Sequence, residues 1–182
     1  DFQNKRLGLI GFGRIGKKIA KRAKAFDLQI NYYCRNQENS DIENQYGAYY
    51  SDLNNLCKNS DFIVVIVPYS KETHHLISYD QISLMKRNSI IVNIARGGVI
   101  NDLALIQALR EKKIYGAGID VFENEPKINK GFYELDNVVL SPHVGSGTYD
   151  TRKSMSLKAS ENIISAVIHK NYINLVNKEV LN

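Results

Sequence analysis

Cysteine and long apolar runs are scarce in this chain of 182 residues. The two cysteines, Cys34 and Cys57, form no CxxC pair and have no histidine at metal-ligand spacing, so we expect no cysteine-based metal centre. A reducing cytosol permits such a cysteine content. No signal peptide opens the chain and no apolar run approaches about 18 residues, so we expect neither secretion nor membrane insertion, and a cytoplasmic location.

Concentrated charge of one sign is also missing. The net charge is +5, but the lysines and arginines are scattered along the sequence rather than massed in one segment. We therefore expect no nucleic-acid partner, and an anionic cofactor would account for some of the local positive charge. The length suits one domain with a real core and is short for two.

Short apolar runs alternate with segments of helical spacing almost throughout, and no internal repeat or clear linker interrupts them. The run FIVVIV at 62–67 lacks polar alternation, as expected for a strand buried on both faces of a parallel sheet. The alternation predicts an α/β fold with a doubly wound parallel sheet. The expected strands are 7–10, 28–33, 46–50, 62–67, 89–94, 115–121 and 137–140, and the expected helices are 17–26, 51–57, 78–85, 101–112 and 148–169.

The first expected strand ends in the glycine turn GFGRIG at 11–16, which a helix and a second strand follow. In this context a GxGxxG turn holds the pyrophosphate of a dinucleotide, because the N-terminus of the helix offers N–H groups to the anion. Gly11 allows the tight turn, Gly13 lets the backbone approach the pyrophosphate, and Gly16 permits close packing of helix and strand. We predict a Rossmann-type dinucleotide-binding domain over residues 1–182.

The second expected strand ends in Cys34 and Arg35, where the dinucleotide fingerprint has an acidic residue that binds the ribose 2′-hydroxyl. A thiol is a poor acceptor for ribose hydroxyls, whereas a guanidinium can hold a 2′-phosphate through two parallel hydrogen bonds. This strand end favours NADP over NAD. The alternative is that Cys34 packs in the core and Arg35 is a solvated charge.

Three further motifs each follow an expected strand: NIARGG at 93–98, GIDVFENEP at 118–126 and SPHVGS at 141–146. The carboxyl ends of parallel strands line one crevice, so we expect Arg96, Glu125 and His143 at one edge of the sheet. Together they would form a site for an anionic carbonyl substrate.

These motifs, in this order and spacing, resemble the nicotinamide-binding domain of the D-isomer-specific 2-hydroxyacid dehydrogenases over residues 7–181. The strand SDFIVVIVP with ETHHLI after it belongs to the same pattern. The strand end YYCR most resembles the glyoxylate and hydroxypyruvate reductase branch, whose members often use NADPH. The resemblance implies an oxidoreductase that uses NADP, or NAD, to reduce a small 2-oxoacid to a D-2-hydroxyacid by hydride transfer.

The resemblance also implies roles for single residues. Arg96 would bind the substrate carboxylate and help to polarise the carbonyl group. His143 would be the general acid, and Glu125 would pair with it, which favours the imidazolium and fixes the ring. Asp120 would contact the nicotinamide carboxamide. The full set of implied cofactor contacts is Gly11, Gly13, Arg14, Ile15, Gly16, Cys34, Arg35, Val67, Pro68, Thr73, Ile94, Ala95, Arg96, Asp120, His143 and Gly145.

The chain departs from the family pattern in two further respects. Ile66 stands where many members carry a histidine. The family's substrate domain, built in relatives mainly from residues before the glycine turn, has no expected place in this chain, so we expect the chain alone to bind dinucleotide but to turn over poorly. Three alternatives stay open: a dinucleotide-sensing corepressor-like module, a phosphoglycerate dehydrogenase-like enzyme with NAD, and a fragment without cofactor binding.

Other polar residues receive simpler interpretations. His74 and His75 are adjacent, but the sequence offers no third ligand at useful spacing, so no metal site is predicted. Glu123 competes with Glu125 for the catalytic role, but only Glu125 fits the family position. His169 is expected at the surface. The resemblance implies a homodimer through this domain, with an exposed apolar patch.

Overall fold

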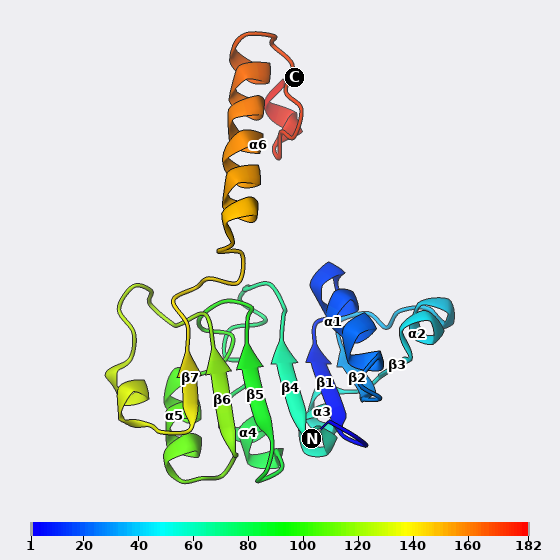
Figure 1. The fold of residues 1–182 in the computed structure, drawn as a ribbon, viewed down its shortest axis with the longest axis vertical. Helices are drawn as coiled ribbons and strands as arrows, with labels where there is room; N and C mark the ends of the chain where they lie inside the picture. The colour runs from blue at the N-terminus through cyan, green and yellow to red at the C-terminus, as the bar shows by residue number, and fades with distance from the viewer. Residues whose placement is uncertain (1, 182) are drawn as a thin grey trace. The chain divides into compact units, whose positions relative to one another are not determined.

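The computed structural model describes residues 2–181 and divides the chain into two compact units, 1–142 and 143–182. The first unit is built around a seven-stranded sheet (Figure 1). Its strands are β1 Arg6–Ile10, β2 Gln29–Tyr33, β3 Ala48–Tyr50, β4 Phe62–Val65, β5 Ile90–Asn93, β6 Gly116–Ile119 and β7 Val138–Leu140. Every neighbouring pair is parallel, in the order β3-β2-β1-β4-β5-β6-β7. The predicted doubly wound parallel sheet is confirmed.

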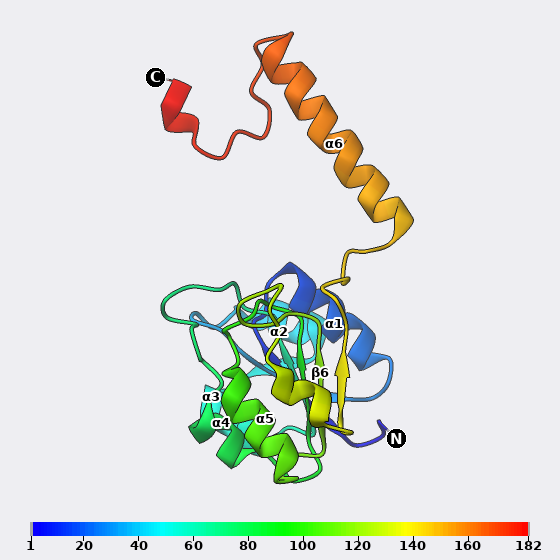
Figure 2. The ribbon, with the colours of Figure 1, turned by 90° about the vertical axis from the view of Figure 1, so that its left-hand side faces the viewer.

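Helices lie on both faces of this sheet, as the edge-on view shows (Figure 2). The helices α3, α4 and α5 share one buried cluster with the sheet, and α1 and α2 pack into a second cluster on the opposite face. The helices are α1 Arg14–Lys24, α2 Ser40–Tyr46, α3 Leu53–Asn59, α4 Tyr79–Leu84 and α5 Asp102–Arg110, with a 3-10 turn η1 at Lys130–Glu134.

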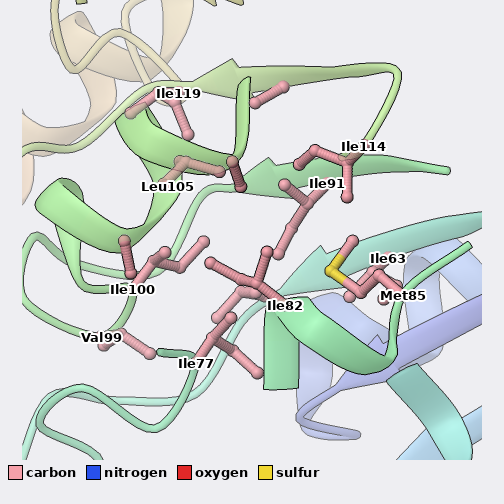
Figure 3. Close-up of a cluster of buried hydrophobic side chains, with 14 of the residues drawn as sticks. Ile63, Ile77, Ile82, Met85, Ile91, Val99, Ile100, Leu105, Ile114 and Ile119 are labelled. Atoms are coloured by element: carbon pink, nitrogen blue, oxygen red, sulfur yellow. The ribbon is translucent and has the colours of Figure 1, made fainter. Parts of the chain in front are cut away.

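Strand β4 shows why the run at 62–67 lacks polar alternation. Ile63 and Val65 belong to the larger cluster, while Phe62 and Val64 pack against the smaller cluster on the other face. Figure 3 shows Ile63 of β4 in the larger cluster, which also includes side chains from β5, β6, α4 and α5. Each fully buried aliphatic side chain of this kind contributes about 1.5–3 kcal/mol, so both faces of the sheet stabilise the fold.

Local capping explains where the helices differ from the sequence prediction. Helix α1 begins at Arg14 rather than 17, because the glycine turn itself leads into the first turn of the helix. Asp52, not Ser51, caps α3, since its carboxylate accepts the Asn55 N–H at 3.0 Å. The sequence prediction missed α2, whose cap is Asn39, and it extended the third strand back into that helix. No residue of α2 is buried, so the sequence of this helix lacks a clear pattern of apolar residues.

The second unit contains helix α6, Tyr149–Val167, and a short 3-10 turn η2 at Lys178–Leu181. Thr148 caps α6, as its hydroxyl oxygen accepts the Thr151 N–H at 3.3 Å. The predicted helix 148–169 is therefore confirmed over most of its length. Within residues 2–181, no helix has both the length and the apolar character that crossing a membrane requires.

Candidate active site at the carboxyl edge of the sheet

The predicted site residues of the first unit follow the carboxyl ends of five strands. The glycine turn follows β1, Cys34 follows β2, Val67 follows β4, Arg96 follows β5 and Asp120 follows β6. The strand order reverses between β1 and β4, which are neighbours in the sheet although two strands separate them in sequence. Ligands of open α/β sheets bind at such a reversal, outside the carboxyl ends of the strands.

The glycine turn has the geometry that the sequence predicted. Gly11 has a φ of +107°, which L side chains rarely adopt. A Cβ on Gly16 would lie 2.6 Å from the carbonyl oxygen of Gly11, so only glycine lets α1 pack this closely on the turn. A Cβ on Gly13 would meet no protein atom within 4 Å. Backbone conformation therefore explains Gly11, packing explains Gly16, and the open space beside Gly13 fits a bound pyrophosphate.

The start of α1 supports the same interpretation. No side chain caps the helix and no acidic residue stands in its first turn, so its first N–H groups face an anion without competition from a carboxylate. Arg14 is the first helical residue, and Ile15 is 57% exposed although it is apolar. The residues present therefore fit a dinucleotide.

At the end of β2, Cys34 is turned into the protein rather than toward a ribose. Its side chain packs against the smaller core cluster, and its thiol donates to the carbonyl oxygen of Asn36 at 2.8 Å. Burial, the largest cause, and the Glu38 carboxylate raise the pKa of this thiol. Arg35 is exposed beside it. Of the two residues, Arg35 alone offers a polar group suited to a 2′-phosphate.

The side chain of Thr73 holds the loop after β4 in shape through two hydrogen bonds. The Thr73 hydroxyl donates to the carbonyl oxygen of Pro68 at 2.8 Å, and the Ser70 N–H donates to the Thr73 hydroxyl oxygen at 2.7 Å. The predicted contacts Val67 and Pro68 lie at the start of this loop, directly beyond β4. Thr73 thus holds the shape of the loop, whatever it contacts in a bound cofactor.

The turn after β5 presents Arg96 to solvent. Buried Asn93 holds the turn, since its side chain accepts the Ala95 N–H at 3.1 Å and donates to the Arg96 carbonyl oxygen at 3.3 Å. The exposed Arg96 side chain donates a hydrogen bond of 2.7 Å to the Ala95 carbonyl oxygen, and Ile94 precedes this turn. A guanidinium in this position is accessible to an anionic substrate.

The loop after β6 lies directly against the Arg96 turn. Gly97 approaches the Phe122 carbonyl so closely that a Cβ there would overlap the Phe122 backbone. In the same loop, the Glu125 carboxylate accepts the Phe122 N–H at 2.8 Å. Asp120 is buried and accepts the Ser141 hydroxyl at 2.6 Å. The fold therefore brings together the loops that carry Arg96 and Glu125.

His143 and Gly145 belong to the second unit, of which His143 is the first residue. His143 is exposed and has a φ of +53°, and both residues interact with other groups. The first unit thus holds two of the three predicted catalytic residues, Arg96 and Glu125. The meeting of His143 with them stays a prediction.

A polar cluster that the sequence prediction missed ties three loops together. The Asn101 side chain caps α5 by accepting the Ala104 N–H at 3.1 Å, so its amide nitrogen faces His75 Nδ1 at 3.3 Å. Nδ1 must then accept, and the proton on Nε2 is directed at the Glu123 carboxylate at 3.3 Å. The His75 ring is thus held between the Asn101 amide and the Glu123 carboxylate.

The expectation that His74 and His75 lack a third potential metal ligand is wrong, since Glu123 is within 4.8 Å of both. This proximity could not be predicted from the sequence, because 48 residues separate Glu123 from His75. One observation still opposes a shared ion. The two rings stack with centroids 3.8 Å apart, so their in-plane lone pairs do not converge.

Asp102 lies buried beside this cluster and accepts the Glu123 N–H at 3.4 Å. Burial raises the pKa of Asp102 to about 6; the Glu123 carboxylate raises it as well, while the Glu123 N–H opposes the shift. Between about pH 4 and pH 6 the folded state keeps a proton that the unfolded state has lost. The free energy of unfolding should therefore fall by about 3 kcal/mol as pH rises through this window.

The Asp102→Asn variant should lose this contribution. In urea unfolding from about pH 4 to pH 7, the free energy of unfolding of wild type minus that of the variant should decline as pH rises. Asp80 is exposed, so the Asp80→Asn variant is the control, and its free energy of unfolding should depend on pH as that of wild type does. Parallel profiles for Asp102→Asn would contradict the raised pKa.

Comparison with known proteins agrees with this geometry. Residues 1–145 match the family profile described as "D-isomer specific 2-hydroxyacid dehydrogenase, NAD binding domain". The chain belongs to this family. It is 46% identical over 182 residues to a protein named glyoxylate reductase from Thermococcus onnurineus, covering 100% of this chain and 54% of that protein.

Solved structures show the same relationship. A glyoxylate reductase from Paecilomyes thermophila superimposes with a TM-score of 0.86 at 35% identity, covering 98% of this chain and 54% of that one. An NADPH-dependent glyoxylate/hydroxypyruvate reductase from Sinorhizobium meliloti, solved with NADP and malonate, superimposes with a TM-score of 0.84 at 33% identity, covering 92% and 51%. The family domain thus binds NAD(P), and the chain spans about half the length of these relatives.

Proposed function

We propose that the protein containing this chain reduces a small 2-oxoacid, of the glyoxylate or hydroxypyruvate kind, to a D-2-hydroxyacid. The observation that carries the proposal is the backbone contact between Gly97 and Phe122. It joins the Arg96 and Glu125 loops at the sheet edge where the glycine turn is open for a dinucleotide. The glyoxylate reductases among the relatives support the same substrate class.

Each proposed catalytic residue has a distinct task. The exposed Arg96 guanidinium binds the substrate carboxylate and orients the neighbouring carbonyl. Glu125 pairs with the His143 imidazole, which favours its protonated form. His143 then donates its proton to the carbonyl oxygen. When bound, the nicotinamide cofactor supplies the hydride, while the protein positions and polarises the substrate.

We propose NADP as the preferred cofactor, with NAD as the other. Arg35 supports this preference, because it is exposed at the end of β2 and suits a 2′-phosphate. The relative described as NADPH-dependent and solved with NADP has a similar fold over 92% of this chain. Asp120 is assigned to the nicotinamide end of the cofactor.

We also propose that the protein forms a homodimer, is located in the cytoplasm and has no nucleic-acid partner. An apolar hollow of about 680 Å³ over β5, β6 and β7 supports self-association, since both faces of a parallel sheet are normally covered. Val139 and Tyr115 in this region are 73% and 68% exposed.

Dinucleotide binding is tested most directly at Gly13. The Gly13→Ala variant should keep the melting temperature within about 2 °C of wild type, because its Cβ meets no protein atom within 4 Å. The same Cβ would stand where the pyrophosphate approaches, so calorimetry should show at least about tenfold weaker binding of NADH and NADPH.

A companion variant and an assay complete this test. Gly16→Ala should instead lower the melting temperature, because its Cβ would collide with the Gly11 carbonyl. The whole protein should oxidise NADPH or NADH when given glyoxylate or hydroxypyruvate. Unchanged dinucleotide affinity of Gly13→Ala, or no turnover with either substrate, would refute the proposal.

A further inference from the structure

An ion pair lies beside the place where the adenosine ribose is expected. Lys17, from the second turn of α1, places its ammonium nitrogen 2.8 Å from the carboxylate of Glu38 in the loop after β2. The two side chains are 24% and 29% exposed, so both are partly withdrawn from solvent but still reachable. The Lys17 nitrogen also lies 5.8 Å from the centre of the Phe12 ring, within the glycine turn.

The loop that carries Glu38 is held by a buried tyrosine. The Tyr32 hydroxyl accepts the Glu38 N–H at 2.9 Å and donates to the Glu43 carboxylate at 2.7 Å. Tyr32 is 0% exposed, and the Gln37 amide also donates to Glu43 at 3.0 Å. Glu38 is therefore fixed in place by the fold.

The pair adjoins the fingerprint position at the end of β2. Glu38 and Lys17 act in opposite directions on the pKa of the Cys34 thiol, which burial raises most. Both charges are thus close to Cys34, the residue that stands where relatives of this fold hold the ribose 2′ group. Arg35 is the next residue along the chain.

The charges at this edge have opposite consequences for the two dinucleotides. The 2′-phosphate of NADPH carries about two negative charges near neutral pH, so a nearby carboxylate repels it and a nearby ammonium attracts it. The Glu38 carboxylate engages Lys17, while Arg35, the exposed residue after Cys34, interacts with the Glu72 carboxylate. A 2′-hydroxyl suffers no such repulsion and can donate to a carboxylate.

We propose that Glu38 masks Lys17 and thereby sets the cofactor choice of this domain. Glu38 moderates the preference for NADPH that Arg35 creates and keeps NADH acceptable. Lys17 is a second ligand for the 2′-phosphate, available once the carboxylate is removed. This inference rests on the proposed dinucleotide function.

The test measures NADH and NADPH affinity of the 182-residue chain by titration calorimetry. Glu38→Gln should strengthen NADPH binding about tenfold and leave NADH binding unchanged or weaker, since a hydrogen bond to a charged group has that size. Asp41→Asn removes the same charge three residues away on exposed surface and should change neither affinity more than about twofold. Arg35→Ala should weaken NADPH binding only.

A double variant identifies the cation. If Lys17 is the masked ligand, Glu38→Gln combined with Lys17→Gln should lose the gain in NADPH affinity, and the gain in Glu38→Gln should shrink at high salt. Equal changes for NADH and NADPH in Glu38→Gln, or a gain that survives Lys17→Gln, would overturn the inference while leaving the proposed function intact. Failure of the wild-type chain to bind either dinucleotide would reject both.

Discussion

Replacing His143 by alanine should lower kcat for glyoxylate reduction by about 10²–10⁴-fold in the whole protein. The physical reason is that no other proposed group can protonate the carbonyl oxygen as the hydride arrives. The affinity for NADPH should change far less than kcat, because His143 is one of many expected cofactor contacts and the glycine turn with α1 carries the pyrophosphate site. Steady-state kinetics with both substrates varied, together with coenzyme titration, measure the two effects separately.

His169→Ala is the matched control, since this histidine is exposed in the same unit and has no proposed role. It should keep wild-type kcat and KM. If His143→Ala retains more than about one tenth of wild-type kcat, the general-acid assignment is wrong. An equal loss in both variants would instead point to a general disturbance of the unit.

Gly97→Ala should cause the largest loss of stability among single methyl additions in this chain. Its Cβ would overlap the Phe122 carbonyl, and a backbone group cannot rotate away as a flexible side chain can. We expect the free energy of unfolding to fall by at least about 3 kcal/mol, and the melting temperature by roughly 10 °C. Because the same contact joins the Arg96 and Glu125 loops, kcat/KM should fall as well.

Gly118→Ala provides the matched comparison for this prediction. A Cβ on Gly118, in strand β6, would lie 3.6 Å from Val92, an ordinary contact distance. The free energy of unfolding of this variant should lie within about 1 kcal/mol of the wild-type value, because the added methyl group enters space that is already open. Similar melting curves for Gly97→Ala and Gly118→Ala would show that the loop contact is not as tight as the structure indicates.

Features that depend on residues close together along the chain could be predicted from the sequence. The run at 62–67 signalled a strand buried on both faces, and β4 packs into both core clusters. The glycine spacing at 11–16 predicted the turn because φ at Gly11 and the approach of Gly16 to Gly11 are local constraints. Helix α2 was missed because it buries no residue completely, which leaves a short amphipathic segment without a clear period.

The sequence by itself determined the parallel sheet, the dinucleotide turn and the positions of Arg96 and Glu125 at strand ends, since strand period and turn chemistry act over a few residues. Only the tertiary structure decided which distant groups meet there. It directed the Cys34 thiol to a backbone carbonyl and paired Lys17 with Glu38 across 21 residues. It also placed Glu123 beside His75. Such contacts follow from the packing of separate loops at one sheet edge, which no spacing along the chain encodes.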